Sequence, residues 1–209
     1  MTQDIIAIDG PAGSGKSTVA AALAQRLGWS VLDTGAMYRA LTVEVLRRGL
    51  DVHDQAAVAE VARSSEIRTR PRVNINGRDV HDDIRSETVN AAVSAVAANA
   101  DARAAMVQRQ RAVADAERGG LVVEGRDITT VVFPDARLKI YLTATLDERA
   151  RRRAEEGHDS VARRDHADAS RTASPLRQAD DATIVDTTGL SVDQVVEEIV
   201  RCLKNTTFS

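Results

Sequence analysis

The sequence predicts an α/β fold, in which a five-stranded parallel sheet is flanked by helices. Short apolar runs alternate along the chain with segments of helical spacing, and fully apolar strands are typical of a parallel sheet covered on both faces. A glycine-rich loop joins the first strand to the first helix. The chain has 209 residues, which is enough for one such core with inserted segments.

Each element follows from a local pattern. The predicted strands are the apolar runs 5–9, 31–33, 121–124, 138–142 and 183–186. The predicted helices are 16–27, 36–48, 102–116, 146–156 and 191–203. In the last of them, Ser191 is expected to be the N-cap and Asp193 to lie in the first turn, where the helix dipole favours an acidic side chain.

Two stretches interrupt the alternation of strands and helices. Residues 67–80 have a β-like pattern, with a hairpin predicted around Asn76-Gly77. We therefore expect an insertion of about 35–103 between the second and third core strands. Residues 149–171 are dense in charge and lack a sustained apolar face, so a short mobile lid is predicted there. The core of this single domain, 1–209, then comprises 1–34, 104–148 and 172–204.

Composition excludes several classes of protein. The net charge is −3 and aromatic residues make up 2% of the chain, so neither nucleic acid nor an anionic membrane surface is expected as a partner. No apolar run approaches the roughly 18 residues of a membrane helix. Cys202 is the sole cysteine, which rules out a disulfide within the chain and a cysteine-based zinc site. The first residues lack the basic region of a signal peptide, and a cytoplasmic protein is expected.

The strongest motif is a phosphate-binding loop. The segment from Gly10 to Ser17 fits the pattern G-x-x-x-x-G-K-[ST] and stands between a strand and a helix, as that motif requires. Glycines let main-chain N–H groups turn toward phosphates, Lys16 reaches the β- and γ-phosphates, and the Ser17 hydroxyl is a ligand of Mg²⁺. The residues predicted to bind ATP are Gly10, Pro11, Ala12, Gly13, Ser14, Gly15, Lys16, Ser17 and Thr18.

This loop is shared by GTPases, ATPases and small-molecule kinases. A GTPase would need a guanine-reading Asn-Lys-x-Asp segment, and none of the three lysines stands in one. A motor ATPase or transporter subunit normally needs a longer chain. Arginines follow the strands at several points, and their planar guanidinium groups suit the phosphate of a second substrate.

Polar residues follow the second and third strands, at the sheet edge where α/β proteins place their ligands. Thr34 can donate and accept hydrogen bonds at a base edge, although Asp33-Thr34 also suits a helix N-cap. After the third strand, Arg126 and Asp127 either face the same cleft or form a simple turn. Glu124 ends that strand and could bind Mg²⁺ through water.

These motifs together resemble the bacterial cytidylate (CMP) kinases, from residue 5 to about 203. The resemblance is carried by 10–18, Asp33-Thr-Gly-Ala-Met-Tyr-Arg39, Ile84-Arg85, Gly125-Arg-Asp127 and Thr130-Val-Val-Phe-Pro-Asp-Ala136. It implies the P-loop nucleoside-monophosphate (NMP) kinase fold, in which the insertion binds the monophosphate and a lid closes. The implied insertion is larger than that of adenylate kinases.

The resemblance also implies roles for individual residues at the CMP site. Those near the base are Thr34, Arg103 and Asp127; those near the sugar are Ser94, Arg164 and Asp168; those that hold the acceptor phosphate are Arg39 and Arg126; and Arg171 lies near base or phosphate. The residues expected to act in transfer are Lys16, Arg126, Arg164 and Arg171. Without the resemblance, the segment 164–171 would be interpreted as a solvated charged surface.

The chain departs from the family pattern in two places. Glu124 occupies a position that is often aspartate, and the lid between 153 and 163 is shorter than usual. One of Arg149, Arg152 and Arg153 is expected over the phosphates, and the sequence does not distinguish among them.

The expected reaction is in-line transfer of the γ-phosphoryl group from Mg·ATP to the 5′-phosphate of CMP or dCMP. ATP and CMP or dCMP are the expected partners of a monomeric enzyme, and Mg²⁺ is the expected cofactor. The alternatives are a nucleotide-binding regulator without kinase activity and a kinase for AMP or UMP.

Overall fold

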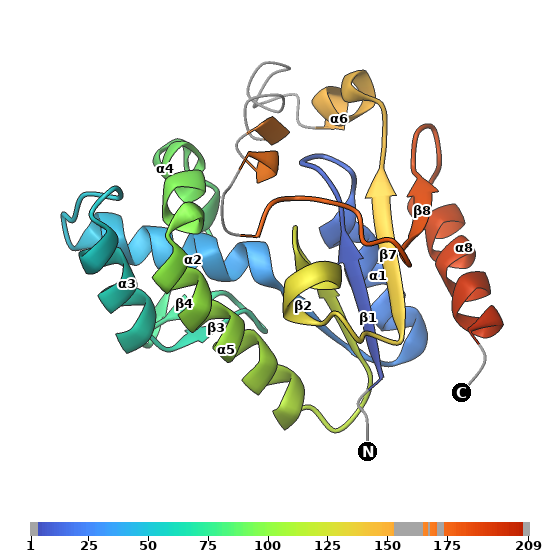
Figure 1. Ribbon diagram of the computed structural model, residues 1–209, viewed down its shortest axis with the longest axis horizontal. Coiled ribbons are helices and arrows are strands. Elements are labelled where there is room, and N and C mark those ends of the chain that lie inside the picture. The colour runs from blue at the N-terminus through green and yellow to red at the C-terminus, as the bar shows by residue number, and fades with distance from the viewer. Residues whose placement is uncertain (1–3, 153–164, 167, 171–173, 207–209) are drawn as a thin grey trace. The chain divides into compact units, whose positions relative to one another are not determined.

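A computed structural model describes residues 4–152, 165–166, 168–170 and 174–206 (Figure 1). Contacts within the chain divide it into two units. The first unit comprises Met1–Leu32 and Ala114–Ser209, and the second comprises Asp33–Val113. The predicted insertion of 35–103 lies within the second unit.

The first unit is built on a five-stranded sheet, as the sequence predicts. Its strand order is β2-β6-β1-β7-β8, and β1 pairs in parallel with both β6 and β7, as β7 does with β8. The strands are β1 Ile5–Asp9, β2 Ser30–Asp33, β6 Leu121–Glu124, β7 Leu138–Thr143 and β8 Thr183–Asp186. Each lies within one residue of its predicted bounds.

The central strand determines where the site can form. All five residues of β1 are buried, and its register places Ile8 opposite Glu124 of β6. The loops that follow β1 and β6 therefore leave the same edge of the sheet side by side. Parallel strands expose their carboxyl ends at one edge, and ligands of α/β proteins bind there.

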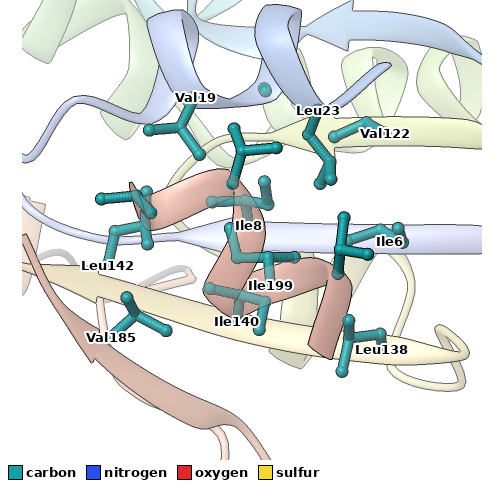
Figure 2. Close-up of a cluster of buried hydrophobic side chains, with 14 of the residues drawn as sticks. Ile6, Ile8, Val19, Leu23, Val122, Leu138, Ile140, Leu142, Val185 and Ile199 are labelled. Carbon is teal, nitrogen blue, oxygen red and sulfur yellow. The ribbon is translucent and has the colours of Figure 1, made fainter. Parts of the chain in front are cut away.

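Helices α1 (Lys16–Leu27) and α8 (Val192–Asn205) pack on the sheet of the first unit. Figure 2 shows Leu23 of α1 and Ile199 of α8 directed toward Ile6, Ile8 and Ile140 of the central strands. These five side chains have no exposed surface. Burying each contributes about 1.5–3 kcal/mol before the entropy of ordering is subtracted. This packing fixes the position of the loop between β1 and α1.

Two further elements of the first unit bear on the site. Ser191 caps α8 and forms a capping box with Gln194, which confirms the predicted N-cap. Helix α6 spans Leu146–Arg152, while the remainder of the predicted helix to 156 lies outside the described residues. A π-helical segment, η2 (Ile128–Val132), follows β6 and has no counterpart among the predicted elements, since its five residues are too few to show a period.

The second unit is mainly helical. Its helices are α2 Thr34–Arg47, α3 Gln55–Ser64, the 3-10 helix η1 Asp83–Arg85, α4 Glu87–Ala98 and most of α5 Ala100–Ala116. Helix α2 begins two residues before the predicted start, because the Asp33 side chain accepts a hydrogen bond from the Ala36 N–H and caps it. The N-cap interpretation of Asp33 is therefore confirmed.

The predicted hairpin is present in the second unit. Strands β4 (Asn74–Ile75) and β5 (Arg78–Asp79) pair antiparallel across a two-residue turn, and β3 (Ile67–Arg68) pairs with β4 as a third strand. In the turn, Asn76 and Gly77 have φ of 52° and 79°. Positive φ at both central positions matches the turn type that twists with the strands, which explains the Asn-Gly sequence.

Candidate functional site

The phosphate-binding loop runs from Gly10 at the end of β1 to the start of α1. Gly15 precedes that helix with φ of 89°, and no side chain caps it. The loop thus leads into the positive end of the helix dipole, which favours an anion. Lys16 is 5% exposed, and its Nζ donates hydrogen bonds to the Pro11 carbonyl at 2.8 Å and to Ser14 Oγ at 3.4 Å. The ammonium group is therefore held along the loop by the loop's own atoms.

Ser17 and Glu124 form a pair of oxygen atoms at the start of α1 and the end of β6. The exposed Ser17 hydroxyl donates a hydrogen bond of 2.5 Å to Glu124 Oε1, and Glu124 is 3% exposed. Mg²⁺ prefers oxygen ligands and usually shares them with substrate phosphates and water. A hydroxyl and a carboxylate beside the phosphate loop fit that donor set.

Arg149 and Asp165 contact the loop from α6 and from the segment after it. The buried Arg149 guanidinium donates to the Ala12 carbonyl at 3.0 Å and pairs with the carboxylate of Asp165. Asp165 Oδ1 accepts a hydrogen bond of 2.9 Å from the Ala12 N–H. Asp165 was not among the predicted site residues, although it stands inside the Arg164-Asp165-x-x-Asp168 motif.

A second set of contacts to the loop involves Thr187, which directly follows β8. Arg152 donates to Thr187 Oγ1 at 2.9 Å and to the Thr187 carbonyl at 2.7 Å, and it pairs with Glu148. The buried Thr187 hydroxyl lies 3.3 Å from the Ser14 carbonyl. Both Arg149 and Arg152 thus have partners around the loop, while Arg153 lies outside the described residues. Nothing in the local sequence distinguishes Thr187 from a surface threonine.

Arg126 and Asp168 meet in the first unit. Arg126 Nε donates to Asp168 Oδ2 at 2.7 Å, and the two side chains are 20% and 12% exposed. Burial lowers the pKa of Arg126, but the carboxylates of Asp168, Glu124 and Asp165 together outweigh burial, so the pKa of Arg126 lies above its ordinary value. The two residues were assigned to the same substrate, and the structure brings them together. Arg164 and Arg171 lie outside the described residues.

Asp127 follows Arg126 and is 4% exposed. Its main-chain carbonyl accepts hydrogen bonds from the Val131 and Val132 N–H groups, so Asp127 forms the start of η2. The segment after β6 is therefore an ordered element rather than a simple turn.

Arg39 lies in α2 of the second unit and is held by two oxygen atoms. Its Nη1 donates to the Ile84 carbonyl at 2.7 Å and to Asn90 Oδ1 at 2.8 Å. Asn90 in turn donates to the Arg85 carbonyl at 3.1 Å, which fixes the orientation of its amide. Asn90 is a residue that sequence reasoning missed, because nothing near it in the sequence marks it as the partner of an arginine.

The other predicted residues of the second unit differ in exposure. Arg103 is 4% exposed, lies 5.3 Å from the centroid of the Tyr38 ring and donates to the Ala97 carbonyl. Thr34 is buried at the first position of α2, and Ser94 is half-buried on α4. Of these residues, Arg103 is held by its contact with the Tyr38 ring and by its hydrogen bond to the Ala97 carbonyl.

Comparison with known proteins identifies the family. Residues 6–205 match the family described as cytidylate kinase. The chain belongs to the cytidylate kinase family. It is 49% identical to a cytidylate kinase of Geobacillus kaustophilus over 212 residues, covering 93% of this chain and 94% of that protein. It is 48% identical to a bifunctional pantoate ligase/cytidylate kinase of Trichormus variabilis, covering 95% of this chain and 41% of that longer protein.

Solved structures support the fold. A crystal structure of TT1252 from Thermus thermophilus covers the whole of both chains with a TM-score of 0.53 at 19% identity. The cytidylate kinase family, the α/β fold class and the ATP-dependent kinase activity on CMP and dCMP, all expected from the sequence, are confirmed. In the described part of the chain, every helix is too short or too polar to cross a membrane.

Proposed function

We propose that the phosphate-binding loop from Gly10 to Thr18 holds ATP for in-line transfer of its γ-phosphoryl group to the 5′-phosphate of CMP or dCMP. The observation that carries the proposal is the arrangement at this loop. Lys16 lies along it, and the helix behind it begins without a side-chain cap. Main-chain N–H groups would then donate to the phosphate oxygens, and the Lys16 ammonium group would bind the β- and γ-phosphates.

Ser17 and Glu124 would hold Mg²⁺ together with phosphate oxygens. Their contact of 2.5 Å supports this assignment, because both oxygens already converge on one point beside the loop. When bound, the ion neutralises part of the phosphate charge and orients the γ-phosphoryl group. Glu124 acts directly or through water.

The acceptor phosphate is assigned to Arg39 and Arg126, with Arg164 and Arg171 joining them in transfer. Arg126 carries a positive charge, as arginine side chains do in proteins, and its pairing with Asp168 at 2.7 Å offsets the cost of burying that charge. A guanidinium group holds phosphate with two parallel hydrogen bonds and so fixes geometry as well as charge. Arg39 is suited to the same task, because Asn90 and the Ile84 carbonyl orient it.

Recognition of the nucleoside is assigned to the remaining predicted residues. A cytosine edge presents an amino group that donates, so the Asp127 carboxylate is a suitable acceptor. Thr34 and Arg103 are assigned to the base, and Ser94, Arg164 and Asp168 are assigned to the sugar. Asp168 would then serve two partners, the sugar and Arg126.

The chemistry needs charge neutralisation more than proton transfer. The acceptor phosphate is already an anion near neutral pH, so no general base is required. ATP and the acceptor nucleotide together carry roughly six negative charges when no metal ion is bound, and the two must be brought together. Lys16 and the arginines neutralise that charge, and exclusion of water around them strengthens each contact and prevents hydrolysis of ATP.

One chain carries the motifs for both donor and acceptor, so no second copy needs to supply a residue. We therefore propose that the enzyme acts as a monomer. We propose the cytoplasm as its compartment, because ATP and CMP are both substrates found there.

A coupled assay of ADP release tests the proposal. CMP, dCMP, UMP and AMP are compared in parallel with ATP and Mg²⁺, with an excess of chelator as control. CMP and dCMP should give the fastest release and UMP a slower one, since uracil presents an acceptor to Asp127 where cytosine presents a donor. A preference for AMP would contradict the assignment of the acceptor site, and no stimulation by any monophosphate would indicate a regulator.

A further inference from the structure

Asp9 is a fully buried carboxylate for which the mechanism above has no task. It is the last residue of β1, and none of its surface is exposed. It directly precedes Gly10, the first residue of the phosphate-binding loop. A buried charge is costly unless it is hydrogen-bonded, so its partners show what it does.

The Asp9 carboxylate accepts hydrogen bonds from the start of η2. Oδ1 accepts from the Ile128 N–H at 3.0 Å, and Oδ2 accepts from the Thr129 N–H at 2.8 Å and from Thr129 Oγ1 at 2.7 Å. Two adjacent N–H groups and one hydroxyl thus point at a single carboxylate. An ionised carboxylate suits them because both of its oxygens only accept.

These bonds link the end of β1, where the phosphate-binding loop begins, to the segment that carries Arg126 and Asp127. Ile128 directly follows Asp127, whose carbonyl accepts from the Val131 and Val132 N–H groups of the same η2 segment. At the other end of the segment, the N–H of Gly125, the residue before Arg126, donates to the Ile8 carbonyl at 2.9 Å. The segment that carries Arg126 and Asp127 is therefore tied at both ends to the last two residues of β1.

The carboxylate is retained at an energetic cost. Burial raises the pKa of Asp9, and the neighbouring charge of Asp127 raises it further, while the hydrogen bonds from Thr129 and Ile128 oppose that rise. An apolar residue at this buried position would avoid the cost of burial. It would leave two N–H groups without their acceptor.

We propose that Asp9 is a positioning residue for the acceptor site, holding the segment of Arg126 and Asp127 at a fixed distance from the phosphate-binding loop. Binding of a cytidine monophosphate then depends on a residue that does not touch it. The inference rests on the proposed function, because it takes Arg126 and Asp127 as the groups that meet the acceptor.

Thr129 offers the sharper test, because its side chain can be altered without removing the buried charge. Thr129→Val keeps the shape and removes one hydrogen bond to the carboxylate, and Thr129→Ser restores the hydroxyl. We expect Thr129→Val to raise the KM for CMP about tenfold, as the loss of a hydrogen bond to a charged group implies. The KM for ATP should change less than about twofold, and Thr129→Ser should return the KM for CMP close to the wild-type value. Asp9→Asn should have the larger effect, since it turns an N–H donor toward other donors.

Thr42→Val is the matched control. Thr42 is also fully buried, and its hydroxyl donates to the Tyr38 carbonyl of its own helix at 2.8 Å. It should lower thermal stability without changing the KM for CMP, and by less than Thr129→Val because its lost partner is a neutral carbonyl. A rise in the KM for CMP in Thr129→Val alone separates positioning from a general structural role.

The dissociation constant of CMP, measured by calorimetry without ATP, completes the test. A rise for Thr129→Val with recovery in Thr129→Ser supports the inference. An unchanged dissociation constant in a less stable Thr129→Val protein would overturn it, as would an equal rise in the KM for ATP. If the wild type binds CMP but releases no ADP, the proposed function fails while the binding comparison still decides the role of Asp9. If the wild type does not bind CMP, both fail.

Discussion

The phosphate-binding loop and the arginines assigned to the acceptor differ in the groups that they present to a substrate. The loop presents main-chain groups, and even Lys16 donates to the Pro11 carbonyl. Arg39 and Arg126 present side chains, and each is oriented by another side chain, Asn90 for the first and Asp168 for the second. The donor site thus depends on backbone conformation, whereas the acceptor site depends on pairs of side chains that lie far apart in sequence.

The difference has a consequence for how each site fails. A backbone site is lost when the chain is forced into another conformation or when its one ammonium group is removed. A side-chain site loses affinity in steps, because each orienting partner contributes a single hydrogen bond of about 0.5–1.5 kcal/mol, or more where a charge is involved.

The largest effect is expected from Lys16→Ala. The ammonium group reaches the phosphates between which the bond is broken, so its loss removes a contact that strengthens in the transition state. We expect kcat to fall by at least about 10²-fold, the scale of one lost transition-state contact. Steady-state kinetics with saturating ATP and CMP measure kcat, and a near-normal kcat would contradict the assignment of the donor site.

Gly13→Ala tests whether backbone conformation governs the donor site. Gly13 has φ of 78°, and a Cβ there would lie 2.7 Å from the Arg149 carbonyl oxygen. We expect kcat/KM for ATP to fall at least about tenfold, because a left-handed conformation alone costs a non-glycine residue about 1–2 kcal/mol and the clash adds to it.

Gly28→Ala is the matched control for that substitution. Gly28 ends α1 with φ of 68°, and nothing lies within 4 Å of the position of its Cβ. It should lose about 1 kcal/mol of stability with unchanged kinetics. Equal kinetic losses in the two variants would show that strain in α1, rather than the shape of the loop, controls the donor site.

A smaller effect is expected from Asn90→Ala on the acceptor side. Arg39 keeps its bond to the Ile84 carbonyl but loses the Asn90 oxygen, so its guanidinium group is less well oriented. We expect the KM for CMP to rise about three- to tenfold with the KM for ATP unchanged, in line with one hydrogen bond. Asn90→Asp retains the accepting oxygen and should recover most of the loss; failure to recover would place the effect in the fold of α4.

The same contrast explains what could be predicted from the sequence. Strands, the phosphate loop, the Asn76-Gly77 turn and the Ser191 cap follow from patterns within a few residues. Local periodicity and positive φ leave such patterns in any chain. The roles given to Arg39 and Arg126 came from resemblance to a family, and they stay predictions.

The residues that sequence reasoning missed share one property. Asp9 meets Thr129 120 positions away, and Asp165 meets Ala12 153 positions away. Such contacts depend on which strands become neighbours, and a single sequence carries no local trace of that. Thr187 is similar, because only the pairing of β8 with β7 brings it to the loop.

The smallest effect concerns side-chain pairing in the second unit away from the assigned residues. Glu44 is 3% exposed, and hydrogen bonds from Arg47 and then Arg48 outweigh its burial and lower its pKa to about 2. Because this folded-state pKa lies below the unfolded one, the pairing stabilises the fold above about pH 4.5 and is lost as pH falls toward 2. We expect Glu44→Gln to lower the free energy of unfolding by about 1 kcal/mol at pH 7, since both arginines are partly exposed and solvent screens them.

Denaturant unfolding followed by circular dichroism at pH 7, 5 and 3.5 measures this difference, which should shrink as the pH falls. Glu60→Gln is the control, because Glu60 and Arg63 pair at 3.2 Å with side chains 66% and 54% exposed. Its effect should stay within about 0.5 kcal/mol at each pH. A loss of unfolding free energy for Glu44→Gln that is as large at pH 3.5 as at pH 7 would assign the stabilisation to packing rather than charge. The need for a paired side chain would then apply to Arg39 and Arg126 and not to Glu44.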